Sequence, residues 1–460
     1  MVTDSRGPAE KAIGLRRVIG PSLLLFFVIG DILGTGIYAL IGSVAARIGG
    51  ALWLPFLMAF LVALLTALSY LELVGKYPRA AGAALYTQLA FGVRFLTFMV
   101  AFAVMASGVT SAASAATAFG ETYLAEFLPL PLWLVGFVFL LGLGLVNFRG
   151  VGESVRANVV LTTVELSGLL IVIAVGSWAV AHGHGEPARL VQFPSTGSGG
   201  WTAITAATSL AFFAMVGFED SVNMAEETRD PGSTFPRAIL LGMAVTAAIY
   251  LVIAGLASTL VPATDLAAEG SGALLRVLQV GAPGFPLKVF AAIGLIAVVN
   301  SALINMLMAS RLLYGMANEG IIPRSFGAVH RRRRTPWVAI VFSSLVAYLL
   351  VITSNLSLLG GTTSLLLLAV FTIVNVAVLV LRRKPVEHAH FRAPTWAPVL
   401  GVLSCGYLAT PLSGRPPEQF VVAGVLLSIG VGLWVINLVL VSRTTQAGPS
   451  PPGDGTSGRS

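Results

Sequence analysis

The sequence predicts an all-α integral membrane protein with twelve membrane-spanning helices. Of its 460 residues, 56% are hydrophobic and only 10% are charged, whereas soluble globular proteins carry about 25% charged residues. About 20 consecutive apolar residues cross the hydrocarbon core of a bilayer. Twelve such runs occur, at approximately 21–45, 50–74, 84–118, 130–147, 157–181, 201–222, 237–261, 285–310, 337–354, 361–381, 396–414 and 420–441. The third run is long, and we expect its helix to start nearer Val93.

Lysine and arginine residues predict the orientation. With the N-terminus in the cytoplasm, 23 of the 28 basic residues fall on the cytoplasmic side, as expected for short loops that are retained there. We therefore expect a multi-pass protein of the cell membrane with both termini cytoplasmic, a polar segment at 1–20 and a disordered tail at 442–460. The net charge is +8, and we interpret the loop HRRRRTP at 330–336 as facing anionic membrane lipid rather than nucleic acid.

The first apolar run carries the polar stretch GDILGTGIY at 30–38. Asp31 lies about ten residues into the run, roughly 15 Å deep, where a charge is costly and indicates function. Gly34 and Gly36 flank Thr35 and weaken the helix, which allows the backbone to unwind around a polar cavity. The N–H groups that an unwound segment frees bind anions well. A close-packing face of small residues is the alternative interpretation.

The sixth run contains a second interruption. It reads SLAFFAMVGFED at 209–220, with Gly217 inside the run and two acidic residues directly after it. Because five crossings separate the two interrupted spans, they run in opposite directions. This pattern predicts two inverted five-helix repeats, at 21–181 and 201–381, with broken helices one and six, followed by two accessory helices within 395–441. Transporters of this construction hold their substrate where the broken helices meet.

Several segments resemble a known family in the expected order. GDILGTGIYALIG, FFAMVGFEDSVNMAEETRDPGSTFPRAI and SALINMLMASRLLYGMANEGIIPRSFGAVHRRRRTPWVAI resemble the first, sixth and eighth helices of the amino acid–polyamine–organocation superfamily. ELVGKYPRAAGAALY at 72–86 resembles its loop after the second helix. The resemblance covers about residues 12–441, and it is strongest to bacterial permeases related to cationic amino acid transporters.

The resemblance implies a substrate site built largely from backbone groups. The substrate carboxylate would be held beside Gly34, by the N–H groups of Thr35 and Gly36 and by the hydroxyl of Thr35. The α-ammonium group would be held by carbonyl oxygens, namely those of Ile32, Phe213, Ala214 and Val216. The ring of Phe213 would close over the substrate as a gate.

Two acidic residues depart from the family pattern. Proton-coupled relatives carry a lysine on the fifth helix, whereas this sequence has Glu165 there, about eight residues into its span. Burial disfavours an ionised carboxyl, so Glu165 is a candidate for proton coupling, with a permanently protonated structural carboxyl as the alternative. Asp31 stands where the family has a small residue. It would attract a cationic ligand, join Glu165 in proton handling, or cap the broken helix.

These observations predict a secondary transporter that imports an amino acid with protons by alternating access. An amino acid or polyamine exchanger without proton coupling remains an alternative, and a non-transporting sensor or a membrane enzyme is less favoured. We expect no catalytic residues, no metal and no cofactor. Small residues at 105–114 suggest a pocket for neutral side chains, but the sequence does not identify the amino acid.

Overall fold

The computed structural model describes residues 19–79, 82–149, 155–193, 200–225 and 227–446. The expected N-terminal segment therefore lies outside the described residues, apart from its last two, and so does the expected tail beyond residue 446. Helices form the regular secondary structure of the described part, and a single isolated bridge joins Ile19 to Thr228. The predicted all-helical architecture is confirmed.

Ten helices in the described residues are long and apolar enough to cross a membrane. They are α1 (Pro21–Ile48), α2 (Trp53–Lys76), α4 (Arg94–Ala118), α5 (Leu132–Arg149), α6 (Val155–Ala181), α7 (Gly200–Ala211, with the turns that follow it), α8 (Pro231–Leu260), α11 (Leu287–Asn318), α13 (Leu356–Leu381) and α15 (Pro417–Gln446). Two shorter apolar helices, α12 (Trp337–Thr353) and α14 (Trp396–Leu408), coincide with the other two expected spans.

The helix boundaries differ from the apolar runs in three places. The third run is divided into α3 (Gly82–Phe91) and α4, and α4 begins at Arg94, close to the expected start. A π-helical turn, Phe119–Leu124, extends α4. Two short helices that the sequence did not indicate, α9 (Ala263–Glu269) and α10 (Ala273–Gly281), lie between α8 and α11.

Local sequence signals explain several helix starts. Pro21 and Pro231 each begin a helix, where the missing N–H of proline would have no partner in any case. The side chain of Asn355 caps α13 by accepting a hydrogen bond from the N–H of Leu358 at 2.9 Å, as asparagine commonly does at this position.

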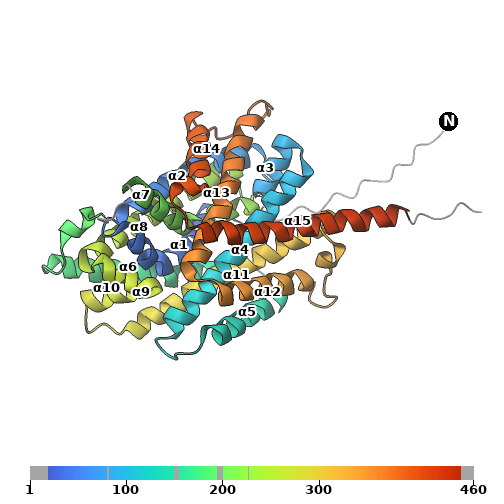
Figure 1. Cartoon of the computed structure of the whole chain (residues 1–460). Coiled ribbons are helices and arrows are strands. Elements are labelled where there is room, and N and C mark those ends of the chain that lie inside the picture. Colours follow the sequence, from blue (N-terminus) through green and yellow to red (C-terminus); the bar gives the residue numbers. More distant parts are fainter. Residues whose placement is uncertain (1–18, 80–81, 150–154, 194–199, 226, 447–460) are drawn as a thin grey trace, which may run out of the picture.

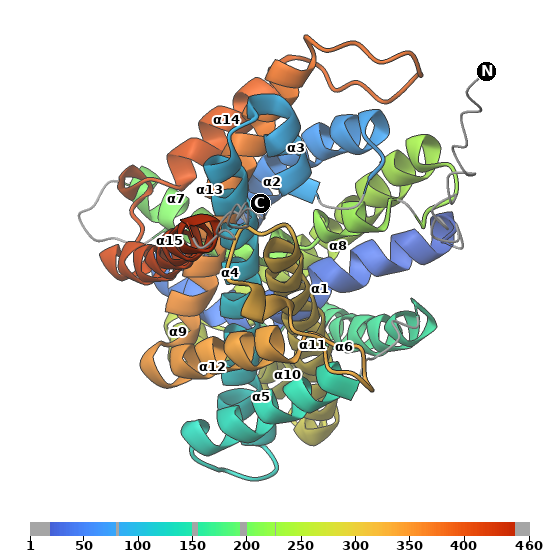
Figure 2. The same ribbon diagram turned by 90° about the vertical axis from the view of Figure 1, so that its right-hand side faces the viewer.

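The first span lies inside the bundle and the last lies on its surface. Most of α1 is buried, and it packs against α6, α7, α8 and α9. The last helix, α15, runs along the outer face beside α4 and α13 (Figure 1). Figure 2 shows α5 beside α12 at one end of the bundle and α14 beside α13 at the other. The segment around Asp31 and Thr35 is therefore shielded from lipid by neighbouring helices.

A polar seam joins α2 to α13 along their shared face. Arg382, which directly follows α13, donates two hydrogen bonds to the carboxylate of Glu72, at 2.8 and 2.6 Å. Ser69 donates to Asn375 at 2.6 Å. The hydrogen bonds to Glu72 raise the pKa of Arg382. These contacts join two helices that both pack against α7, the helix of the sixth span.

Candidate functional site

The helix of the first span is interrupted at Gly34. Its backbone angles, φ −7° and ψ −153°, are not helical, although helix continues on both sides. A Cβ atom at Gly34 would lie 2.9 Å from the hydroxyl oxygen of Ser301 on α11. The predicted break in the first span is confirmed, and it lies against the eighth span.

The sixth span is interrupted as well. After α7 the chain forms a tight 3-10 turn, Phe212–Met215, and Val216 is then extended. Gly217 has φ +127°, a conformation that strongly favours glycine. A second 3-10 turn, Asp220–Met224, follows. The predicted second break is therefore confirmed at Val216 and Gly217.

The two breaks touch each other at two points. A Cβ atom at Gly36 would lie 2.4 Å from the Cα of Ala214, and one at Gly217 would lie 2.7 Å from the carbonyl carbon of Asp31. Only glycine allows the backbones to approach so closely. The sequence therefore brings two segments about 180 residues apart into direct backbone contact.

A polar cavity opens where the breaks meet. Residues of both breaks, of α4 and of α11 line it: Asp31, Ile32, Gly34, Thr35, Gly36, Ser111, Phe213, Val216, Gly217, Asp220, Ser301 and Asn305. Six of the seven residues to which the resemblance assigns substrate contact are among them. The seventh, Ala214, instead packs behind Gly36.

Two polar atoms at this cavity have no partner within the described residues. They are the hydroxyl oxygen of Thr35, a residue that is 1% exposed, and Oδ2 of Asp31. Buried polar groups are normally hydrogen-bonded, so unpartnered atoms that face a cavity indicate a ligand. Other groups freed by the break are already bonded: Tyr250 on α8 donates to the carbonyl oxygens of Ile32, at 2.7 Å, and Leu33, at 3.1 Å.

Glu165 lies beside the first break but does not line the cavity. It is fully buried on α6, and the hydroxyl of Tyr38 on α1 donates to its backbone oxygen at 2.5 Å. Neither carboxyl oxygen has a hydrogen-bond partner in the described part of the chain. The side-chain amide of Asn300 on α11 lies next to this carboxyl. Glu165 therefore contacts α1, which carries the first break, and α11, which packs against that break.

Sequence reasoning did not assign five of the lining residues. Ser111, Ser301 and Asn305 lie on α4 and α11, and the sequence alone does not show which faces of these helices meet the cavity. Gly217 and Asp220 lie in the second break itself, and whether they face the cavity depends on the geometry of the turn. The small residues around 105–114 were the available signal for Ser111.

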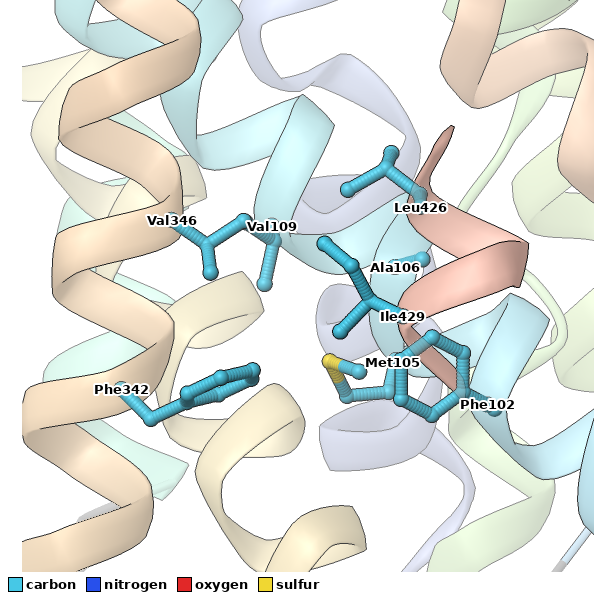
Figure 3. Close-up of a pocket in the computed structure, with 8 residues that line it drawn as sticks. All are labelled: Phe102, Met105, Ala106, Val109, Phe342, Val346, Leu426 and Ile429. Carbon is cyan, nitrogen blue, oxygen red and sulfur yellow. The ribbon is translucent and has the colours of Figure 1, made fainter. Parts of the chain in front are cut away.

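A second cavity, between α4, α12 and α15, has a different character. Its eight lining side chains, which include Met105, Phe342 and Leu426, are all apolar (Figure 3). Such a surface offers no partner for a charged ligand, because burying an unpaired charge is very costly. The polar cavity is therefore the candidate for binding a charged or zwitterionic substrate.

Comparison with known proteins gives concordant matches over most of the chain. A family model described as amino acid permease matches residues 19–440. The chain is 26% identical to the branched-chain amino acid permease BcaP of Bacillus subtilis, over 89% of this chain and 90% of that protein. It is 30% identical to the methylthioribose transporter of the same organism, over 86% and 88% of the two chains. It is also 29% identical to cationic amino acid transporter 4 of Mus musculus, over 80% of this chain and 60% of that protein.

Proposed function

We propose that this chain, which belongs to the amino acid permease family, imports an amino acid across the cell membrane by alternating access and couples this import to protons. The family and the relatives are permeases and transporters, so the chain is a multi-pass amino acid transporter and not an enzyme. In the proposed orientation both termini are cytoplasmic, and the arginine-rich loop at 331–334 faces anionic lipid.

The meeting of the two broken spans at a polar cavity is the observation that carries the proposal. The half-helix that resumes after Gly34 has its N-terminal end at the break. In the proposed site the N–H groups of Thr35 and Gly36 at this end bind the substrate carboxylate, which a helix N-terminus favours. The unpartnered hydroxyl of Thr35 supplies a further donor. An amino acid carboxylate matches this donor set, and Gly36 provides the close backbone approach that it requires.

Phe213 is the proposed gate. Its side chain lines the cavity and is 6% exposed. Because it lies on the short 3-10 turn that follows α7, a change of this turn would move the ring relative to the site. Closing an aromatic ring over a charged substrate excludes water and strengthens the polar contacts beneath it.

Glu165 is the proposed proton carrier. An ionised carboxylate with no hydrogen-bond partner is costly at membrane depth, so the arrangement around Glu165 favours the protonated form. Loss of the proton would favour a different packing of α6 against α1 and α11. A proton gradient can drive transport only through such a difference between two conformations.

Uptake by proteoliposomes tests the proposed function. The purified full-length protein is reconstituted, and uptake of each radiolabelled proteinogenic amino acid is measured with and without an inward proton gradient. At least one amino acid should be taken up, and the gradient should raise its accumulation. Equal accumulation with and without the proton gradient would indicate exchange without proton coupling. Methylthioribose belongs in the panel because one relative is named as its transporter; uptake of that compound and of no amino acid would contradict the proposal.

A further inference from the structure

Two carboxyl side chains face the polar cavity, and none of its lining residues in the described part of the chain is a lysine or arginine. Asp31 comes from α1, and Asp220 comes from the turn that follows the second break. Both residues line the same cavity, so their carboxyl groups are neighbours across it. Two carboxylates that line one cavity stabilise a cation between them and repel each other without one.

The geometry of the second break explains why Asp220 faces the cavity and its neighbour does not. The N–H of Asp220 donates to the carbonyl of Gly217 at 3.1 Å, which folds the chain back toward the first break. The carboxylate of Glu219 accepts a hydrogen bond from the N–H of Gly217 at 2.9 Å. Glu219 therefore holds the turn and does not line the cavity.

Within the described residues, some acceptors of the first break have hydrogen-bond partners and one does not. The Ile32 and Leu33 carbonyls accept hydrogen bonds from Tyr250. Oδ2 of Asp31 is buried and has no partner within the described residues, and the hydroxyl of Thr35 in the same cavity also has none. The cavity thus presents an unpartnered acceptor at Asp31 and an unpartnered hydroxyl at Thr35. Together with the proposed carboxylate-binding N–H groups of Thr35 and Gly36, they match the two charges of an amino acid.

We infer that Asp31 and Asp220 bind the ammonium group of the substrate, while Thr35 and Gly36 bind its carboxylate. This inference rests on the proposed function, and it assigns the ammonium group to side-chain carboxylates rather than chiefly to backbone carbonyls. A charged acceptor forms a stronger hydrogen bond to an ammonium group than a neutral carbonyl does. A substrate analogue that keeps the ammonium group but lacks the carboxylate should therefore still bind.

Ligand-induced stabilisation of the purified full-length protein tests this assignment. The probes are each proteinogenic amino acid and its decarboxylated amine, for example leucine with 3-methylbutylamine, lysine with cadaverine and arginine with agmatine. Affinities are then measured by competition against the radiolabelled amino acid that stabilises the protein most. The variants are Asp31→Asn and Asp220→Asn, each with a Ser variant at the same position in case one of them misfolds. Glu219→Gln is the matched control, because glutamine still accepts from Gly217.

In the wild type, the amine should compete with its parent amino acid. Each aspartate variant should bind the amino acid roughly tenfold more weakly or worse and should lose competition by the amine, since a charge-assisted hydrogen bond is removed. Glu219→Gln should retain both. Unchanged affinity in the aspartate variants, or an equal loss in Glu219→Gln, would overturn the assignment.

The amines also separate this inference from the proposed function. If no amino acid stabilises the wild type, the proposed function fails, and the amines alone then decide the role of the aspartates. Stabilisation by an amine that disappears in Asp31→Asn and Asp220→Asn would still support an ammonium site. Absence of stabilisation by every amine would overturn it.

Discussion

The backbones of Gly36 and Ala214 are in such close contact that a Cβ atom on Gly36 would lie 2.4 Å from the Cα of Ala214. This contact joins the two interrupted spans at the point where the substrate carboxylate is proposed to bind. Backbone lies on both sides, so no flexible side chain can move away to make room. The packing of the two breaks therefore depends on the absence of a single side-chain carbon.

We predict that Gly36→Ala abolishes amino acid binding. The added methyl group must separate the two breaks, and overpacking of this kind typically costs about 1–3 kcal/mol. Binding is measured with the purified variant, and a thermal melt confirms that it folds. Gly255→Ala is the control, because a Cβ atom on Gly255, within α8, has no atom nearby. Near wild-type affinity in Gly36→Ala would contradict the proposed carboxylate site.

We predict that Phe213→Ala weakens substrate retention and lowers uptake. Removing the ring would admit water to the bound substrate and weaken its polar contacts. Dissociation of preloaded radiolabelled amino acid from the protein measures retention. Phe137→Ala, at a position that is 50% exposed on α5, controls for the loss of an aromatic ring elsewhere. Uptake kinetics equal to those of the wild type would leave Phe213 as a packing residue.

We predict that Tyr250→Phe destabilises the first break. The variant leaves the carbonyls of Ile32 and Leu33 without their buried donor, and an unsatisfied buried polar group costs about 1–3 kcal/mol. The melting temperature and the amino acid affinity should both fall. Tyr348→Phe is the control, since its hydroxyl makes no hydrogen bond to the described residues. A Tyr250→Phe protein with unchanged melting temperature and affinity would show that water or substrate satisfies these carbonyls equally well.

We predict that Arg382→Met lowers the stability of the protein strongly. The side chain of Glu72 is 3% exposed and would remain as a buried, unpaired charge, and breaking such a pair typically costs about 3–5 kcal/mol. The double variant Glu72→Leu with Arg382→Met should recover much of the lost melting temperature, because it removes both charges. Equal melting temperatures for the single and the double variant would argue that the ion pair is not the source of the loss.

The sequence predicts the backbone features of the site better than its side-chain surroundings. Gly34 and Gly217 interrupt otherwise apolar runs, and such interruptions can be recognised in the sequence alone. Tyr250 and Asp220 could not be placed, because the first lies in a span with no polar stripe to indicate its facing and the second depends on the turn after Gly217. The short helices α9 and α10 were not predicted, because apolar runs of about 20 residues identify membrane spans and not the short helices between them.

Glu165 shows both what the sequence can predict and what requires the structure. The sequence shows that Glu165 lies within the fifth span, and the hydrogen bond from Tyr38 on α1 to its backbone oxygen shows that it lies near the first break. Two further features could not be predicted without the packing of three helices. Its carboxyl oxygens have no hydrogen-bond partner within the described residues, and the side-chain amide of Asn300 lies next to them. Its role in proton coupling stays a prediction.

A paired transport assay on Glu165→Gln tests proton-coupled transport most directly. Glutamine keeps the shape of the protonated side chain but cannot release a proton, so substrate counterflow should persist while accumulation driven by an inward proton gradient disappears. Both rates are measured in the same proteoliposomes, with Glu121→Gln as a control at an exposed carboxyl of the membrane domain. Persistent counterflow without gradient-driven accumulation is the predicted result. Continued accumulation in response to the gradient would contradict the coupling role of Glu165.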